Sequence, residues 1–250
     1  MKIAIDARII YTSTGRYVER LLHHLQELDH DNEYIVLLLA KDFERWQPTA
    51  TNFSKAIADY PPYTFAEQIR FAIQLYKLKA DVVHFTMPNF PIFYFRPHVT
   101  TVHDLTLITF VNTRKLGFLK DLYKNKLKPF VFKIVIWFVV HGSREIITPT
   151  EYVKGEIVRR LRVKLWRITV TYESAELTVT GKKPYEALVD QKYVLYVGNA
   201  FPYKNLEQLI RSFSFIQTQG HKLVLVGKKD FFYEQLASFV DESGIEDILF

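Results

Sequence analysis

The stretch YVLYVGNAFPYKNLEQLI, residues 193–210, joins a run of apolar and β-branched residues to a helical pattern. Gly198 and Asn199 end the apolar run, and Lys204 stands where the helical pattern begins. A strand that enters a helix through a tight turn is the repeating unit of parallel α/β sheets. The stretch therefore predicts an α/β fold, with a glycine turn and a lysine where the strand ends and the helix begins.

The same alternation of strand and helix patterns runs along the whole chain. A first series predicts strands at 2–6, 34–39, 55–58, 81–85, 98–102, 144–148 and 167–171, and helices at 16–28, 64–78, 116–140 and 150–161. A second series predicts strands at 192–197, 222–226 and 247–250, and helices at 203–217 and 230–243. The alternation in the first series predicts a parallel sheet covered on both faces by helices.

The two series differ in length. Residues 1–172 suffice for a complete Rossmann-like domain, and residues 173–190, ESAELTVTGKKPYEALVD, lack a clear period and predict a linker. Residues 191–250 are too few to bury a large core, and three parallel strands with two helices leave apolar edges unpaired. We expect this segment to be the first part of a second Rossmann-like domain; a compact small domain is the alternative.

Composition excludes several classes of protein. The 250 residues are 48% hydrophobic and 24% charged and contain no cysteine, which excludes disulfides and thiolate metal sites. The amino terminus MKIAIDARII does not resemble a signal peptide, and the longest apolar run, residues 129–140, is too short to cross a bilayer. No GxGxxG, Walker lysine loop, HExxH or nucleophile elbow is present. From the lack of cysteine and of a signal peptide, we expect a cytoplasmic protein.

The first candidate site lies in DARIIYTSTGRY, residues 6–17, because open α/β sheets bind ligands at the carboxyl ends of their strands. Gly15 directly precedes a predicted helix that begins at Arg16. A glycine lets backbone N–H groups approach an anion, and the helix dipole favours negative charge there. The alternative is structural, with Thr14 capping the helix and Gly15 relieving a turn.

Two histidines follow predicted strands. His103 and Asp104 come directly after a β-branched run, where a histidine can exchange a proton or hydrogen-bond a sugar hydroxyl. His84, in DVVHFTMPNFP, precedes an aromatic loop that could shape an acceptor pocket or pack in the core. For both histidines a purely structural role is the alternative.

Lys204 is the third candidate. Its ammonium group adds positive charge to a helix start that already favours phosphate, whereas a merely solvated lysine is mildly unfavourable there. Glu207, three residues later, can form an ordinary same-face pair and is given no catalytic role.

A basic segment lies in the first series. Between Arg114 and Lys133 there are seven Lys and Arg residues and one acid, and Lys120, Lys124 and Lys128 recur at intervals of four. A helix with such a stripe beside an apolar stripe can lie on an anionic membrane surface. The alternative is a solvated basic face over a buried apolar one. A nucleic-acid binder is disfavoured, because no recognised motif accompanies the charges.

Taken in order, the segments IAIDARIIYTSTGRYVERLL, ADVVHFTMPNF, VTTVHDLTLITF, IITPTEYVKGEIVRRL and YVLYVGNAFPYKNLEQLIRSF resemble the retaining glycosyltransferases of family 4, which have the GT-B fold. The resemblance covers essentially the full chain, and its most specific parts are TVHDLT and YVGN…KNL. It is greatest to mannosyltransferase-like members that build lipopolysaccharide, capsule or other surface glycans.

The resemblance implies transfer from a nucleotide-diphosphate sugar to a glycan or lipid-linked acceptor, with retained configuration and without a required metal or cofactor. It implies donor contacts by Lys204, Gly198, Asn199 and Gly15, acceptor contacts by Thr14, Arg16 and His84, and His103 with Asp104 at the reacting centre. Related transferases use the region of the basic segment to meet lipid-linked acceptors, so the resemblance also implies a peripheral position on the inner face of the membrane.

Three features depart from the family pattern. The first loop has one glycine instead of two, Tyr203 replaces an arginine that often precedes the lysine, and a later pair of glutamates is absent. These departures indicate a fragment of an enzyme that is not fully active alone. A truncated, non-catalytic nucleotide-binding relic or regulatory module is the alternative function.

Overall fold

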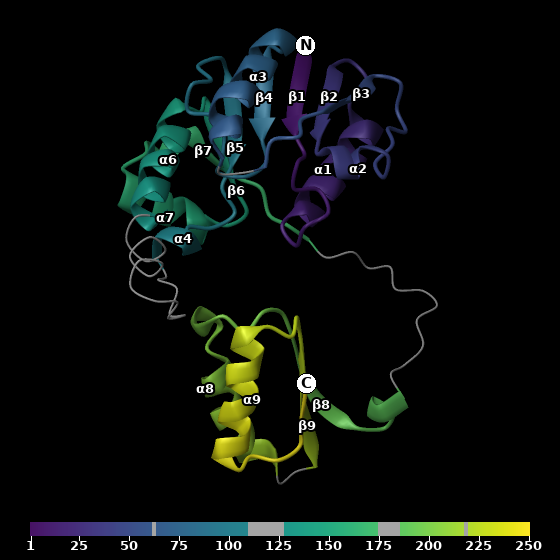
Figure 1. The fold of residues 1–250 in the computed structure, drawn as a ribbon, viewed down its shortest axis with the longest axis vertical. Helices are drawn as coiled ribbons and strands as arrows, with labels where there is room; N and C mark the ends of the chain where they lie inside the picture. Colours follow the sequence, from purple (N-terminus) through teal and green to yellow (C-terminus); the bar gives the residue numbers. More distant parts are fainter. Residues whose placement is uncertain (62–63, 110–127, 175–185, 218–219) are drawn as a thin grey trace. The chain divides into compact units, whose positions relative to one another are not determined.

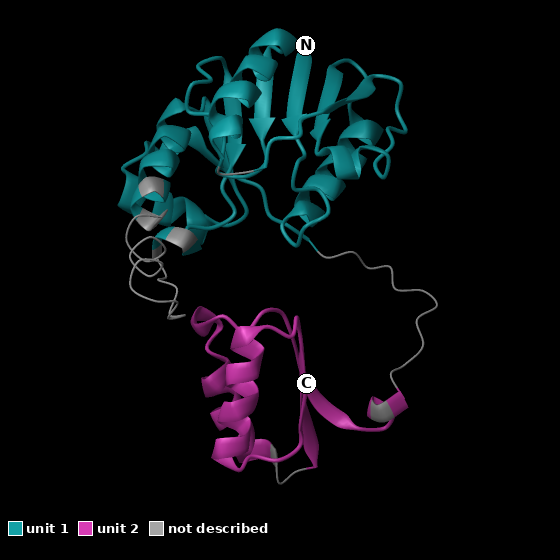
Figure 2. Cartoon of the chain, viewed as in Figure 1, with its two compact units in different colours: residues 1–175 teal, residues 176–250 magenta. Residues whose placement is uncertain are grey.

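The structure, a computed structural model, describes all of the chain except residues 62–63, 110–127, 175–185 and 218–219. It divides into two compact units, Met1–Ala175 and Glu176–Phe250 (Figure 2). The boundary between the units falls inside segment 173–190, for which the sequence predicts a linker.

Unit 1 contains a seven-stranded parallel sheet in the order β3-β2-β1-β4-β5-β6-β7 (Figure 1). Its strands are β1 (Lys2–Asp6), β2 (Glu33–Leu38), β3 (Phe53–Ile57), β4 (Val82–Phe85), β5 (His98–Thr101), β6 (Glu145–Thr148) and β7 (Ile168–Val170). Strand order reverses between β1 and β4, and ligands of doubly wound sheets bind beyond the carboxyl ends of strands at such a point. The predicted α/β fold with a parallel sheet is confirmed.

Helices cover both faces of this sheet. They are α1 (Gly15–Leu28), α2 (Ala40–Phe43), the π-helical turn η1 (Glu67–Phe71), α3 (Ala72–Leu78), α4 (Thr106–Thr109), α6 (Lys128–Gly142), α7 (Glu151–Leu161) and the 3-10 turn η3 (Leu165–Arg167). Two core clusters result: Ile5 packs with Leu22 of α1, whereas its neighbour Ala4 packs with Leu75 of α3 and Ile136 of α6. Successive side chains of β1 are thus buried on opposite faces, which explains its nearly continuous apolar sequence.

Unit 2 contains a three-stranded parallel sheet in the order β10-β9-β8. Its elements are the 3-10 turn η4 (Glu186–Leu188), β8 (Lys192–Val197), the 3-10 turn η5 (Pro202–Lys204), α8 (Leu206–Gln217), β9 (His221–Val226), α9 (Phe231–Ser243) and β10 (Ile248–Leu249). One face of the sheet packs against residues of both helices, including Phe213 and Leu236. On the other face of β8, Leu195 and Val197 are 52% and 69% exposed.

Two predicted helices differ in detail. The helix predicted from residue 203 begins at Leu206, because Pro202–Lys204 form a 3-10 turn that ends at Asn205 in the left-handed region, with φ of 54°. Lys204 therefore precedes α8. Of the helix predicted at 116–140, only the part in α6 falls within the described residues. Lys120, Lys124 and the side chain of Lys128 lie outside them, so the basic stripe stays a prediction.

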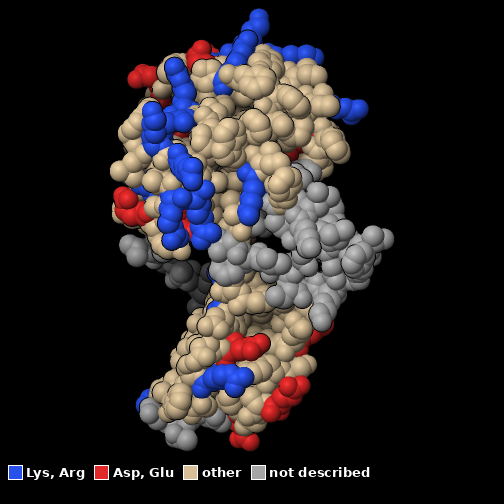
Figure 3. Space-filling model, turned by 90° about the vertical axis from the view of Figure 1, so that its left-hand side faces the viewer, with Lys and Arg blue, Asp and Glu red and all other residues tan. Residues whose placement is uncertain are grey.

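The side of unit 1 that carries α6 and α7 is rich in Lys and Arg (Figure 3). Exposed basic residues of α7 and the segment after it include Arg159, Arg160, Arg162 and Lys164. Within the described residues, no helix is both long enough and apolar enough to cross a membrane.

Candidate functional site

The carboxyl ends of β1, β4 and β5 bring the predicted histidines together. Parallel pairing places Asp6 beside Phe85 and Phe85 beside Thr100, so the residues that follow these strands emerge at one edge of the sheet. The site there comprises Tyr17 of α1, His84 and Thr86 around the end of β4, Thr101 and His103 around the end of β5, and Glu173 after β7.

His103 is held by three neighbours. Its Nε2 lies 3.0 Å from the carbonyl oxygen of Thr86, and because a carbonyl only accepts, Nε2 carries the proton of that hydrogen bond. Its Nδ1 lies 3.3 Å from Oε1 of Glu173, and its ring meets that of Tyr17 edge to face at 4.8 Å. The side chain keeps 15% of its surface exposed. These contacts fix the ring at the edge of the sheet, where the sequence predicted a catalytic histidine.

His84 lies within β4 and belongs to a short hydrogen-bonded chain. Its Nε2 is 2.8 Å from Oγ1 of Thr101, which is 3.2 Å from the hydroxyl oxygen of Tyr17. Burial lowers the pKa of His84 to about 4; Asp6 opposes this shift, and His103 adds to it. His84, which was predicted to contact the acceptor substrate, is therefore neutral at pH 7, and its ring nitrogen Nε2 contacts Thr101.

The low pKa of His84 predicts a loss of stability in acid. In the unfolded chain His84 has a pKa near 6.5, whereas in the folded protein it binds a proton only near pH 4. Stability therefore falls as the pH drops from 6.5 to 4, by up to about 3 kcal/mol. Urea unfolding at several pH values checks this prediction with His84→Gln, which does not titrate and should lose correspondingly less stability over this range. Burial also lowers the pKa of His98, but that histidine contributes equally in both proteins. The prediction would be contradicted if the free energy of unfolding fell equally with pH in the wild type and in His84→Gln.

A buried ion network lies beside the end of β1. Nε and Nη2 of Arg8 are 2.8 and 2.7 Å from the two carboxylate oxygens of Asp6, and Nη2 is also 2.8 Å from Oε1 of Glu67. Asn89 donates from Nδ2 to both oxygens of Glu67, at 2.7 and 2.8 Å. Burial disfavours the charge of Arg8, but the two carboxylates more than offset it and raise its pKa above the ordinary value. The network ties the end of β1 to η1 and to the loop after β4.

Sequence reasoning missed this network. Asp6 and Arg8 stand in the quoted stretch DARIIYTSTGRY, and two opposite charges at the end of a buried strand were an available signal. Buried charges require partners. Glu67 and Asn89, however, come from distant parts of the chain and carried no comparable signal.

The loop before α1 is held internally. The N–H of Gly15 donates to the carbonyl oxygen and to Oγ1 of Thr12, each at 3.1 Å, so this N–H is already used within the loop. A Cβ atom at residue 15 would lie 1.8 Å from the carbonyl oxygen of Ile9, which only a glycine avoids. Thr14 occupies the N-cap position of α1 without a side-chain hydrogen bond, and the side chain of Thr12 holds the loop instead.

The outer surface of this loop is hollowed. Arg16 and Thr14 are exposed. A shallow hollow of ≈ 310 Å³ is lined by Ile10, Tyr11, Thr12, Ser13, Arg16, Glu19 and Arg45. Arg16, which was predicted to contact the acceptor substrate, thus lines a surface depression of unit 1.

Gly15 and Gly155 offer a matched pair of substitutions. Gly15→Ala brings Cβ against backbone and should destabilise the fold by about 1–3 kcal/mol or more. Gly155, inside α7, has nothing within 4 Å of an added Cβ, and Gly155→Ala should stabilise by roughly 0.5–1 kcal/mol. Thermal unfolding of both variants measures the contrast, and a neutral Gly15→Ala would contradict the close approach.

Asp104, predicted beside His103 at the reacting centre, has a visible structural task. Its Oδ1 accepts a hydrogen bond from the backbone N–H of Thr106 at 2.9 Å, at the start of α4. Aspartate side chains commonly accept a hydrogen bond from the backbone N–H two residues later, which forms a local turn.

Unit 2 carries the other predicted residues in the segment that follows β8. The hydroxyl of Tyr233 donates to the carbonyl oxygen of Gly198 at 2.8 Å, and that of Tyr196 donates to the carbonyl oxygen of Asn199 at 2.8 Å. A Cβ atom on Gly227 would lie 2.2 Å from the carbonyl oxygen of Gly198. The Gly198-Asn199 turn is thus fixed by two tyrosines that sequence reasoning did not select.

Lys204 lies in η5, after this turn. The residue is exposed, and its Nζ lies 5.4 Å from the ring centroid of Tyr203. The aromatic ring of Tyr203 thus neighbours the lysine. Lys204 presents a positive charge at the surface of unit 2.

Comparison with solved structures identifies the fold. A glycosyltransferase from Rickettsia africae has a TM-score of 0.61 at 11% identity, with 100% of this chain and 67% of that chain covered. The apo lipopolysaccharide outer core galactosyltransferase WaaB has a TM-score of 0.55 at 14% identity, with the same coverage. S. aureus MnaA in complex with UDP has a TM-score of 0.51 at 15% identity, with 99% of this chain and 68% of that chain covered. The α/β fold is that of GT-B glycosyltransferases.

Comparison of sequences identifies the family. No curated protein matches the chain. The family model of Glycosyltransferase Family 4 matches residues 14–177, which include nearly all of unit 1 after its first strand. Because this match spans more than half of the 250 residues, the chain belongs to glycosyltransferase family 4.

Proposed function

We propose that this glycosyltransferase moves a hexose, with mannose as the first candidate, from a nucleotide-diphosphate sugar to a hydroxyl group of a glycan or lipid-linked acceptor, with retained anomeric configuration. The observation that carries the proposal is the fixed histidine at the carboxyl edge of the first sheet. His103 is oriented by Thr86, Glu173 and Tyr17, and fixed orientation of a reacting group lowers the cost of reaching the transition state.

The donor side of the proposal rests on unit 2. Negative charge develops on the departing diphosphate, so a cation placed there stabilises the transition state more than the ground state. Lys204 supplies such a cation beside the turn of Gly198 and Asn199, which Tyr196 and Tyr233 hold in place. The complex of MnaA with UDP supports the nucleotide class of the donor, since that protein shares this fold.

The acceptor side rests on unit 1. The hollow that contains Arg16, next to Thr14, is a surface on which hydroxyl groups of an acceptor can bind. His84 supports the site through Thr101 and Tyr17, because a neutral ring can take part in hydrogen bonds without adding charge.

A lipid-linked acceptor places the enzyme at an anionic membrane in the synthesis of surface polysaccharide. Two observations support this location: the basic side of unit 1 (Figure 3), and large apolar side chains exposed on α6 and η3. Phe130, Trp137 and Trp166 are 60%, 49% and 74% exposed. Trp and basic residues together favour the membrane interface. Flotation with anionic liposomes tests the location, and unchanged flotation after neutralisation of Lys120, Lys124 and Lys128 would contradict it.

The reaction is tested by incubating the full chain with nucleotide sugars and glycan or lipid-linked acceptors and following the anomeric proton by NMR. Product with the donor's configuration and one released nucleoside diphosphate per transfer supports the proposal. Inverted product contradicts retention. Nucleotide binding without transfer supports the alternative of a non-catalytic module.

A further inference from the structure

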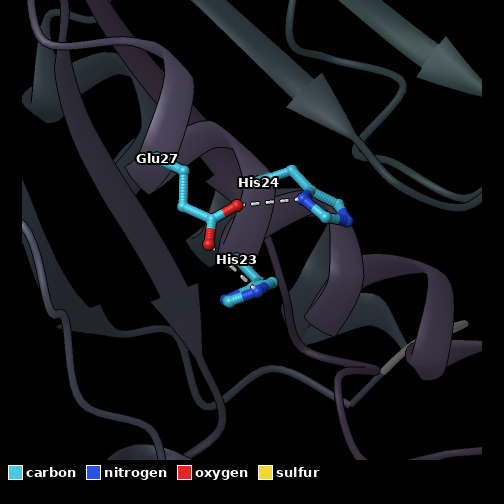
Figure 4. A group of neighbouring side chains, drawn as sticks. All are labelled: His23, His24 and Glu27. Carbon is cyan, nitrogen blue, oxygen red and sulfur yellow. Dashed lines mark hydrogen bonds and ion pairs between the residues drawn. The ribbon is translucent and has the colours of Figure 1, made fainter. Parts of the chain in front are cut away.

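Three potential metal ligands meet on the exposed surface of α1 (Figure 4). Nε2 of His23 lies 3.4 Å from one carboxylate oxygen of Glu27, and Nδ1 of His24 lies 3.2 Å from the other. One ligand atom from each residue lies within 4.8 Å of the other two. The helix produces this meeting, since residues three and four apart share a face.

We propose that His23, His24 and Glu27 form a surface site for a divalent transition metal, with Zn²⁺ as the best fit. Imidazole nitrogen and carboxylate oxygen are both good ligands for zinc. With zinc–ligand bonds of about 2.0–2.1 Å, neighbouring atoms of a tetrahedron are roughly 3.4 Å apart. Each nitrogen lies at about this separation from a different oxygen of the carboxylate, so Glu27 can bind the ion through either oxygen or through both. Small side-chain rotations bring both nitrogens to a single ion, and water completes its shell.

The surroundings set a modest affinity. Nη2 of Arg20 lies 3.5 Å from Nε2 of His24, so one positive charge faces the site. The side chains of His23 and Glu27 are about half exposed, and solvent screens both this repulsion and the attraction of the carboxylate. The site therefore binds more weakly than a buried structural zinc site.

The site is independent of glycosyl transfer. His23 to Glu27 occupy the last turns of α1, whereas Tyr17, which contacts His103, lies in its first turn. The sequence HHLQE does not match HExxH, which is why sequence reasoning did not select it. Because the three ligands meet only when the helix is folded, the metal binds the folded state more tightly than the unfolded one and should raise the unfolding temperature of the chain.

Calorimetric titration of zinc chloride into the metal-free full chain tests the site. We expect one ion to bind, and His23→Ala and His24→Ala each to weaken binding at least about tenfold, since loss even of an indirect partner costs 10- to 100-fold. His30→Ala, an exposed histidine just beyond the same helix, is the control and should bind like the wild type.

A second readout separates direct ligation from altered folding. Imidazole NMR signals of His23 and His24 should shift on addition of zinc chloride, whereas that of His30 should not. Absence of binding, wild-type affinity in both alanine variants, or equal loss in His30→Ala would overturn the proposal.

Discussion

Replacement of His103 by alanine is expected to lower the kcat of glycosyl transfer by about 100-fold or more, with little change in donor affinity. A positioned histidine typically contributes 10²–10⁴-fold to a reaction through proton transfer. The ring is fixed by Thr86, Glu173 and Tyr17, so its removal takes away an oriented group without moving the turn proposed to bind the diphosphate. Steady-state kinetics with separate kcat and KM values measure the effect.

Two controls accompany this prediction. Thermal unfolding of His103→Ala shows whether loss of the hydrogen bond to Thr86 alters the fold. We expect the variant to stay folded, because a hydrogen bond contributes only about 1 kcal/mol net. His30→Ala, exposed and distant in sequence, should keep wild-type kinetics. Unchanged kinetics in folded His103→Ala would return His103 to a structural role.

Replacement of Lys204 by alanine is expected to reduce turnover by about 10²–10³-fold, the usual effect of removing one group that stabilises developing negative charge. The fold should change little, because the residue is exposed and its aromatic neighbour Tyr203 remains. Activity measured at saturating acceptor, over a range of donor concentrations, shows how the loss divides between KM and kcat.

Matched substitutions make this result specific. Lys192→Ala removes an exposed lysine at the start of β8, away from the turn that follows this strand, and should have wild-type activity. Lys204→Arg keeps the charge and should recover part of the rate. Wild-type turnover in Lys204→Ala would remove Lys204 from the donor site.

The sheet of unit 1 could be predicted because its central strands are buried on both faces. KIAID of β1 and DVVHF around β4 are short apolar runs bounded by polar residues, which is typical of central parallel strands. The start of α8 was predicted too early, because Pro202 begins a 3-10 turn and Asn205 takes a left-handed conformation before the helix starts. Both effects are local, and a helical period does not reveal them.

The site was only partly predictable, because its contacts join distant parts of the chain. The strand-end position of His103 was visible, but its partner Glu173 fell in the predicted linker, and only the path of β7 brings it back. For Gly15, the sequence left an anion contact and a structural turn as alternatives. The structure adds a steric requirement for glycine, because the carbonyl oxygen of Ile9 leaves no room for a side chain, and no sequence period reports such an approach.

We propose that this chain binds a nucleotide-diphosphate sugar through the cation of Lys204 and that His103 acts in the reaction instead. Thermal unfolding of the wild type, Lys204→Ala and His103→Ala in the presence of a panel of nucleotide sugars and nucleosides tests it most directly. We predict that at least one nucleotide sugar raises the unfolding temperature of the wild type and of His103→Ala, that Lys204→Ala loses this rise, and that nucleosides produce none. No rise with any nucleotide sugar, or an equal rise in Lys204→Ala, would contradict the account.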